Sequence, residues 1–348
     1  MTEFPVSNSF HLLVRNLPLA GHGGGLLAAR QAYPQAPEPW LDLSTGVSPY
    51  AYPFERLPKE IFTRLPEPEE VYALEATAKH AYQAPRHAEV VAAPGTQAII
   101  NWLPRLATAR RVGILGFTYC EHARRWDESG AYVVEAVELA ALKGKDVAIV
   151  VNPNNPDGRV IPPSELLELA GALASRGGLL IIDEAFADFL GPAASLAPVL
   201  PSRGAVVLRS FGKTYGLPGL RLGFAIAPRP IAEKLRVALG PWPVSGPAIA
   251  AAEKALLDAQ WLAAARARLE KDAAALDGIL AEAGLARVGG TPLFRLVGHK
   301  NAQRIFDHLA GAGILVRRFA ARPDWLRFGI LAQEKDRARL RAALRAAL

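Results

Sequence analysis

The sequence predicts an α/β protein in which a large domain, built on a mostly parallel β-sheet, is joined to a smaller α+β domain. Three observations support this fold class. Short apolar runs alternate with helix-length segments from about residue 88, and this alternation is typical of parallel sheets covered by helices. The alternation stops at the proline-rich segment 241–247. Hydrophobic residues make up 51% of the 348 residues, which is enough to form substantial cores.

The elements follow in chain order. The predicted strands of the large domain are the apolar runs at residues 90–92, 112–115, 146–151, 179–182 and 205–208. Between them, residues 163–174 are a predicted helix, because Pro163 suits a first helical turn and Glu165 suits the helix dipole. After the proline-rich break, the pattern predicts a long helical stretch at 248–283, strands at 292–297, 314–317 and 325–330, a helix at 302–310 and a terminal helix.

These patterns divide the chain into three parts. Residues 1–45 are rich in Pro and Gly and too weakly periodic to form a core, so we expect an N-terminal arm that contributes to the small domain and to the active site. Residues 46–245 form the expected large, ligand-binding domain. Residues 246–348 form the expected small C-terminal domain.

Composition excludes several classes of protein. The single Cys120 cannot form an internal disulfide, and no Cys/His cluster has the spacing of a metal site. No apolar run approaches the roughly 18 residues of a membrane span, and the N-terminus lacks a signal-peptide pattern, so we expect a cytoplasmic protein without membrane contact. The formal charge of +7 is spread over mixed-charge helical segments and accompanies no nucleic-acid-reading motif. A small anionic substrate remains compatible with this charge.

Turn-rich polar segments follow the predicted strands, where open α/β sheets bind their ligands. Gly95, Thr96 and Gln97 open a helix whose N–H groups can hold a phosphate. Tyr119 follows the next strand and can stack on a planar ring. Asn155 lies in the turn Asn-Pro-Asn-Asn-Pro-Asp-Gly and offers an amide donor. Each position also fits an ordinary turn or core residue.

Two further strand ends carry charged groups. Asp183 directly follows an apolar run, and a buried carboxylate is costly unless it is paired with a cation such as a protonated ring nitrogen. Ser210, Lys213 and Arg221 place a hydroxyl, an amine and a guanidinium in one segment. A Lys at a buried sheet end can lose its proton and attack an aldehyde. Taken in order, these groups are those needed to bind pyridoxal 5'-phosphate.

On these motifs the chain resembles the fold-type-I pyridoxal-phosphate enzymes of the class I and II aminotransferase family, with an aspartate-aminotransferase-like fold, from about residue 20 to 330. The resemblance implies that Lys213 forms the Schiff base, that Asp183 keeps the ring nitrogen protonated and that Tyr119 covers the ring. These three are the expected catalytic residues. Asn155 would donate to the phenolic oxygen of the ring. The implied phosphate ligands are Gly95, Thr96, Gln97, Ser210 and Arg221.

Two positions depart from the usual pattern of the family. Phe186 stands where members commonly have a Tyr that donates a second hydrogen bond to the ring oxygen. Leu65 stands in an Arg-Leu-Pro segment where members have a Tyr that reaches the cofactor phosphate of the neighbouring subunit. The resemblance therefore implies a homodimer, although Leu65 cannot make that contact.

The N-terminal segment separates the subfamilies. His22, Gly23 and Gly24 suit an anion held by an imidazole and backbone N–H groups. With the Asp-Glu-Ala-Phe sequence at 183–186, this start is similar to the L-threonine O-3-phosphate decarboxylases of cobalamin biosynthesis, which release (R)-1-amino-2-propanol O-2-phosphate. The resemblance implies that substrate is bound by His22, Gly23, Gly24, Asn155, Arg317 and Arg327.

Several alternatives stay open at this point. An aminotransferase acting on histidinol phosphate or on another amino acid would use the same fold and cofactor. A binding or regulatory protein could keep the fold without catalysis. Arg318 is adjacent to Arg317, and either side chain could face the site. The acid that reprotonates the substrate carbon after decarboxylation is not identified, with Lys213 as one candidate.

Overall fold

The computed structural model describes residues 4–5, 22–54 and 56–348 and divides them into two compact units. The first unit consists of the described residues of Met1–Val6, Ala51–Asn155 and Arg159–Leu262. The second consists of those of Ser7–Tyr50, Pro156–Gly158 and Ala263–Leu348. The second unit is therefore assembled from three separate stretches of chain.

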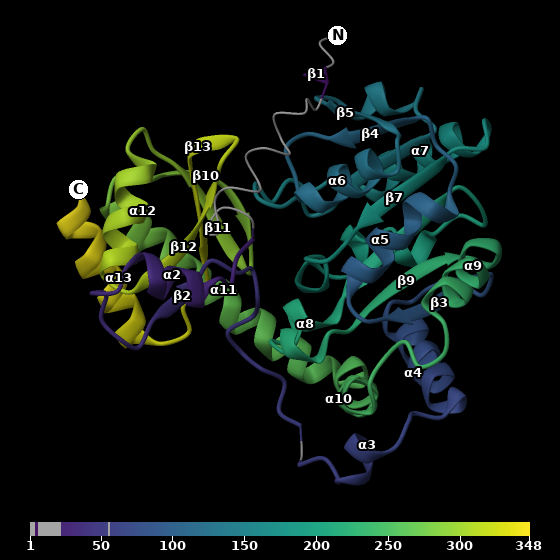
Figure 1. Cartoon of the computed structure of the whole chain (residues 1–348), viewed down its shortest axis with the longest axis horizontal. Coiled ribbons are helices and arrows are strands. Elements are labelled where there is room, and N and C mark those ends of the chain that lie inside the picture. Colours follow the sequence, from purple (N-terminus) through teal and green to yellow (C-terminus); the bar gives the residue numbers. More distant parts are fainter. Residues whose placement is uncertain (1–3, 6–21, 55) are drawn as a thin grey trace. The chain divides into compact units, whose positions relative to one another are not determined.

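The first unit is built on an eight-stranded mixed sheet (Figure 1). Five neighbouring strands run parallel in the order β5, β4, β6, β7 and β8. β9 and β3 are antiparallel at one edge, and the short β1 is antiparallel at the other. Their bounds are β1 Phe4–Pro5, β3 Ala88–Ala93, β4 Arg111–Leu115, β5 Tyr132–Ala136, β6 Val147–Val151, β7 Leu179–Asp183, β8 Ala205–Ser210 and β9 Gly223–Pro228.

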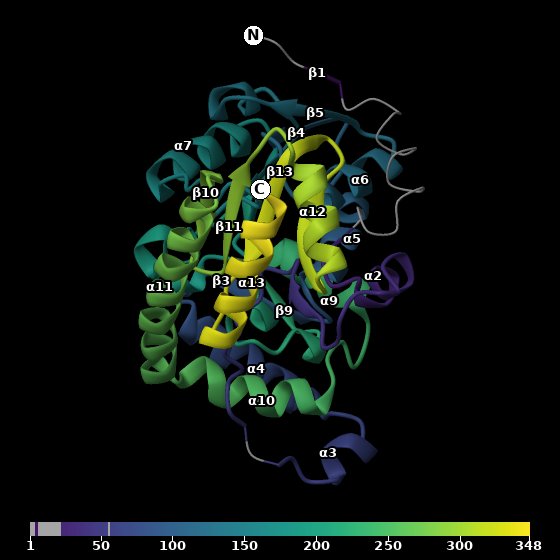
Figure 2. The same cartoon turned by 90° about the vertical axis from the view of Figure 1, so that its left-hand side faces the viewer.

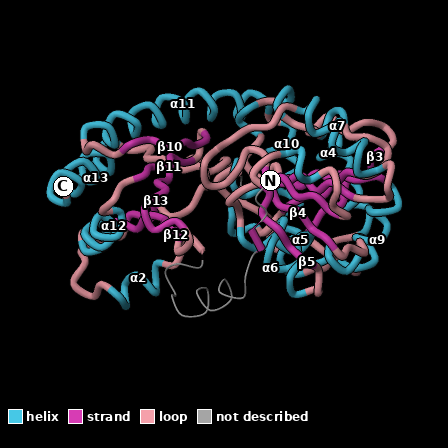
Figure 3. The backbone as a smooth tube through the Cα atoms, turned by 90° about the horizontal axis from the view of Figure 1, so that it is seen from above, coloured by secondary structure: helices cyan, strands magenta, loops and turns pink. Residues whose placement is uncertain are grey.

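Helices cover both faces of this sheet (Figure 3). One face packs against α4 (Pro68–Ala81), α7 (Pro163–Ala174) and α10 (Gly246–Leu257). The other face packs against α5 (Thr96–Leu106), α6 (Cys120–Glu128) and α9 (Arg229–Leu239). Burial on both faces explains why the central strands are continuous apolar runs in the sequence. Two one-turn helices, α3 (Glu60–Thr63) and α8 (Phe211–Thr214), lie in the connections.

The α/β fold and all five strands predicted for the large domain are confirmed, as is the helix at 163–174. The sequence analysis predicted neither β5 nor β9. β9 is rich in Gly and Ala, which have low intrinsic strand propensity, and it pairs with β8 on one side and β3 on the other. Its conformation is therefore set by its two neighbours in the sheet.

The second unit contains a five-stranded sheet in the order β10, β11, β13, β12 and β2 (Figure 1). Its strands β10, β11 and β13 are also labelled in Figure 2. Its strands are antiparallel except for the β12–β2 pair. Their bounds are β2 Leu41–Leu43, β10 Ala286–Thr291, β11 Phe294–Gly298, β12 Ile314–Phe319 and β13 Arg322–Gly329. The unit also contains α2 (Leu26–Ala32), α12 (Ala302–Gly311), α13 (Glu334–Ala347) and most of α11 (Ala259–Glu282). Within the described ranges, no helix is both long enough and apolar enough to cross a membrane.

The structure divides the chain later than the predicted break at residue 245. Residues as far as Leu262 belong to the first unit, because α10 places Ala248, Ile249 and Ala252 in the core beneath the sheet. The helical stretch predicted at 248–283 is also two helices. Asp258 lies between them, and its Oδ1 accepts a hydrogen bond from Trp261 N at 2.8 Å, which caps the start of α11.

Candidate active site

Three of the expected site residues of the first unit follow neighbouring parallel strands. Asp183 is the last residue of β7, Asn155 follows β6, and Lys213 lies on α8 directly after β8. In the sheet register Asp183 pairs with Val151 on one side and Leu208 on the other. Because these strands are parallel, their carboxyl ends meet at one edge, as expected for a ligand site in an open α/β sheet.

Asp183 is only 4% exposed, and its carboxylate has two hydrogen-bond partners. His122 Nε2 lies 2.9 Å from Oδ2, and Ala185 N donates to Oδ1 at 3.0 Å. Burial raises the pKa of Asp183, but the hydrogen bond and charge of His122, the charge of Lys213 and the Ala185 N–H outweigh burial. The net pKa is lowered, so the carboxylate stays ionised and can pair with a cation.

Lys213 lies close to Phe186, one of the two positions that depart from the family pattern. Its Nζ is 4.0 Å from the centre of the Phe186 ring, and Phe186 is buried. The aromatic face attracts an ammonium group but offers it no hydrogen bond. Phe186 therefore provides an apolar wall beside the Lys213 amine.

Tyr119 is positioned by a chain of polar contacts. Its hydroxyl donates to Gln97 Oε1 at 2.9 Å, and its ring packs edge-on against His122 with centroids 6.1 Å apart. Gln97 Nε2 donates to Asn101 Oδ1 and to the buried Glu121 carboxylate. Two acceptors thus fix the amide orientation of Gln97 and direct its carbonyl oxygen at Tyr119. Only the Gln97 backbone N–H remains suited to phosphate binding.

The predicted phosphate ligands gather at the start of α5. Gly95 has φ +80°, and a Cβ at this position would lie 2.8 Å from Arg221 Nη2. Gly223, which pairs with Ser210 in the sheet, approaches so closely that a Cβ there would lie 2.5 Å from Thr96 N. The two glycines therefore let three donors come close together: the Arg221 guanidinium, the end of β8 that carries the Ser210 hydroxyl, and the N-terminus of α5. Anion binding requires such a group of donors.

The Asn-rich turn after β6 is held by its own side chains. Asn152 bonds both backbone groups facing it, donating to Ile161 O at 3.0 Å and accepting from Ile161 N at 2.8 Å. Asn154 Nδ2 donates to Phe117 O at 3.1 Å. Asn155 lies half-buried in this turn. Asn152 and Asn154 therefore hold the turn itself, whereas the sequence analysis assigns Asn155 to the cofactor.

The residues of the first unit fit pyridoxal phosphate. They supply an ionised buried carboxylate, an amine beside an apolar wall, an aromatic ring and a glycine-lined anion cradle. His122 was not identified from the sequence, because a His three residues after Tyr119 on a helix carries no signal of its own. Only the fold reveals that its ring meets Asp183.

The second unit contains a pair of guanidinium groups. Arg317 and Arg327 lie directly opposite each other on β12 and β13, and Arg327 is only 6% exposed. Burial, with a further contribution from the charge of Arg317, lowers the pKa of Arg327 to about 9. The structure also separates Arg317 from Arg318, because Arg318 donates to Gln303 and packs over Phe306 on α12. Arg317 alone shares a sheet face with Arg327.

Ser44 connects the predicted N-terminal glycines to this pair. Its carbonyl accepts from Arg327 Nη2 at 3.0 Å, and its hydroxyl accepts from Gly24 N at 2.7 Å. A Cβ at Gly23 would lie 2.4 Å from Ser44 O, so only glycine fits there. Gly23 and Gly24 therefore lie beside Arg327, but the Gly24 N–H is already engaged by Ser44. His22 is exposed at the start of this turn.

Comparison with known proteins assigns the chain to a family. Residues 59–346 match the family model of class I and II aminotransferases. Threonine-phosphate decarboxylases from Sinorhizobium sp. and Pseudomonas aeruginosa are each 43% identical over 326 residues, which cover 93% of this chain and 97% and 96% of theirs. A histidinol-phosphate aminotransferase from Paracoccus denitrificans is 30% identical over 67% of this chain and 63% of its own.

The fold agrees with solved structures. The histidinol-phosphate aminotransferase from Sinorhizobium meliloti, solved in complex with pyridoxal-5'-phosphate, superposes with a TM-score of 0.79 at 21% identity, covering 98% of both chains. The segment that matches the family model spans both units, from α3 to α13. The chain belongs to the class I and II aminotransferase family.

Proposed function

We propose that the chain decarboxylates L-threonine O-3-phosphate to (R)-1-amino-2-propanol O-2-phosphate in cobalamin biosynthesis, using pyridoxal phosphate. The near-full-length 43% identity to threonine-phosphate decarboxylases carries this proposal. The guanidinium pair supports it, because the substrate has two anionic groups, a carboxylate and a phosphate. Phe186 and Leu65, the two departures from the aminotransferase pattern, also favour a decarboxylase over an aminotransferase.

The chain's own residues have distinct tasks in this reaction. Pyridoxal phosphate, when bound, supplies an electron sink for the bond that breaks. Asp183, which remains ionised, would hold the protonated ring nitrogen, and Asn155 would donate to the ring's phenolic oxygen. Lys213 would supply the amine that holds the cofactor's aldehyde. Tyr119 would cover the ring and exclude water.

The substrate's orientation decides which bond breaks. Decarboxylation would therefore need the substrate carboxylate held in one fixed orientation by the chain's own residues. Arg327 and Arg317 are the groups we assign to this task, because bidentate guanidinium bonds fix the plane of a carboxylate or phosphate. His22 adds a further donor, and Gly23 and Gly24 shape the turn that meets Ser44.

The first test is a direct assay without an amino acceptor. Purified enzyme with pyridoxal phosphate should convert threonine O-3-phosphate into carbon dioxide and aminopropanol phosphate in equal amounts over many turnovers, as measured by mass spectrometry. Lys213→Ala is the matched inactive control. Amino transfer that appears only with 2-oxoglutarate or an imidazole substrate, without carbon dioxide, would instead establish the aminotransferase.

Arg317→Gln should stabilise the substrate-free enzyme while weakening substrate binding. The change removes one of two like charges that oppose each other across paired strands, a contact that costs roughly 0.2–1 kcal/mol. The melting temperature should rise, whereas KM for threonine O-3-phosphate should increase roughly 10- to 100-fold, the worth of a charged hydrogen bond. Arg318→Gln removes the same charge one residue away and should leave KM unchanged. A lower melting temperature with an unaltered KM would make Arg317 a structural residue.

His122→Phe should weaken cofactor binding. An aromatic ring is kept, although a slightly larger one, but Asp183 loses the partner that opposes its burial, so the pKa of Asp183 rises. The apo-protein should bind pyridoxal phosphate roughly 10- to 150-fold more weakly. As the pH falls, binding should be lost at a higher pH than in the unaltered chain. Fluorescence titration measures both effects, and His87→Phe, which removes a ring bonded to Leu200 O, is the control. Equal affinities in the two variants would refute the role of His122.

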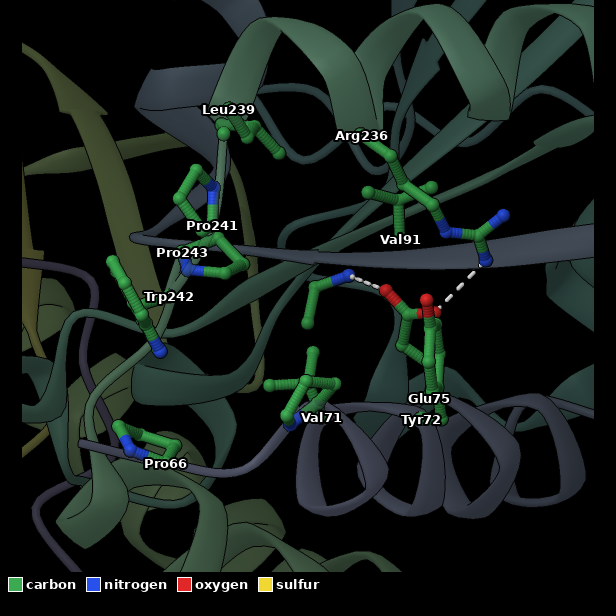
Figure 4. A pocket seen from close by; sticks show the side chains of 13 residues that line it. Pro66, Val71, Tyr72, Glu75, Val91, Arg236, Leu239, Pro241, Trp242 and Pro243 are labelled. Carbon is green, nitrogen blue, oxygen red and sulfur yellow. Dashed lines mark hydrogen bonds and ion pairs between the residues drawn. The ribbon is translucent and has the colours of Figure 1, made fainter.

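We also propose that the chain forms a homodimer through an apolar surface of the first unit. A cavity of about 350 Å³ lies between α4, β3 and the segment after α9 (Figure 4). Its floor is the Glu75–Arg236 ion pair, 2.8 Å between Nη2 and Oε2. Pro66, next to Leu65, lines this cavity, and the family resemblance assigns that segment to subunit contact. Large apolar side chains exposed on the flanking elements are Phe62, Leu65, Tyr72, Val237 and Trp242.

Trp242→Glu should convert the dimer to monomers. Trp242 is 53% exposed and lines the cavity, so a carboxylate there would be buried unpaired in the contact. Tyr132→Glu is the matched control, because Tyr132 is 56% exposed on β5, towards the opposite edge of the same sheet. Light scattering after size exclusion gives the mass. A dimer that survives Trp242→Glu would exclude this surface as the interface.

A further inference from the structure

A buried charged cluster lies beside the Lys213 segment. Arg209 Nη1 donates to Glu184 Oε2 at 2.7 Å, and Nη2 donates to Asp188 Oδ1. Asp188 Oδ2 also accepts a hydrogen bond from the hydroxyl of Thr214. The side chains of Arg209, Glu184 and Asp188 are 7%, 0% and 6% exposed, and Thr214 is fully buried. Asp188 therefore joins a strand end to the helix that carries Lys213.

Three members of the cluster are chain neighbours of cofactor-site residues. Glu184 follows Asp183, Arg209 precedes Ser210, and Thr214 follows Lys213. Successive side chains of a strand point to opposite faces of the sheet. Glu184 and Arg209 therefore point to the opposite sheet face from Asp183 and Ser210, whereas Thr214 comes from α8, next to Lys213.

The two hydrophobic cores identify the faces. Ala205 and Val207 of β8 belong to the core that contains Phe211 and Tyr215, and Arg209 continues their alternation. Val206 and Leu208 belong to the other core, and Ser210 continues theirs. In the same way Ile182 precedes Glu184 on the first face, and Ile181 precedes Asp183 on the second. Arg209 and Glu184 thus lie on the opposite face of one sheet edge from Ser210 and Asp183.

The helix that carries Lys213 depends on such contacts. α8 has four residues, and a single helical turn has no stability of its own in water. One side of it is fixed by the Phe211 ring, which stacks on Tyr215 with centroids 4.4 Å apart. The Thr214–Asp188 hydrogen bond constrains the turn next to Lys213. Rotation of this turn would move the Lys213 amine.

We propose that Asp188, held by Arg209, is a positioning residue that fixes Lys213 through the hydroxyl of Thr214. The inference rests on the proposed attachment of pyridoxal phosphate to Lys213. The cofactor ligands determine where the aldehyde lies, and the cluster determines where the amine lies. Condensation of the two, with release of one water, requires both positions to be fixed together.

Thr214→Val tests this role, because it keeps the buried volume but removes the hydroxyl. Apo-protein is titrated with pyridoxal phosphate and with 4-deoxypyridoxine 5'-phosphate, an analogue that has no aldehyde and cannot bond to Lys213. We expect roughly 10- to 100-fold weaker binding of pyridoxal phosphate and unchanged binding of the analogue. Thr214→Ser restores the hydroxyl and should restore the affinity.

Two controls separate the possible failures. Thr291→Val makes the same substitution at another buried Thr, whose hydroxyl accepts from Leu293 N, and should leave both affinities unchanged. Equal weakening of both ligands by Thr214→Val, or no weakening of either, would overturn the positioning role. If the unaltered chain binds the aldehyde no better than the analogue, the proposed use of Lys213 fails first.

Discussion

The site depends on keeping the Asp183 carboxylate charged where almost no water reaches it. Burial alone would raise the pKa of this group, and the chain counters it with His122, the Ala185 N–H and the charge of Lys213. Each contribution comes from a different part of the first unit: α6, the turn after β7, and α8. The order of the parallel strands is what brings them together. An ionised acid at this edge can hold a cationic ring, which is the basis of the proposed chemistry.

The second unit holds two like charges close together instead of a charge paired with its partners. Arg317 and Arg327 oppose each other across β12 and β13, and the buried member has a lowered pKa. Binding of an anion by this pair, as proposed, would relieve the repulsion between the two charges, so stability would be exchanged for affinity. Ser44 links Arg327 to the glycine turn. A dianionic amino acid phosphate is a ligand that matches this pair.

The two departures from the family pattern have different structural consequences. Phe186 replaces a hydroxyl donor with an apolar ring beside Lys213, so it changes the surroundings of the amine directly. Leu65 is 60% exposed next to the apolar cavity of the first unit, where a hydroxyl would serve a partner rather than this chain. One replacement thus concerns the chemistry and the other the proposed interface.

The sequence by itself determined the α/β class and five strands of the large sheet, and it predicted the cofactor residues from Gly95 to Arg221, because these depend on local periodicity and on turns at strand ends. Tertiary structure decided the rest. It placed Arg317 rather than Arg318 opposite Arg327 through strand register, it brought His122 to Asp183 across 61 positions of sequence, and it kept α10 in the first unit through contacts with the sheet core. These outcomes depend on which faces pack together, and local sequence patterns contain no information on contacts between segments distant in the chain.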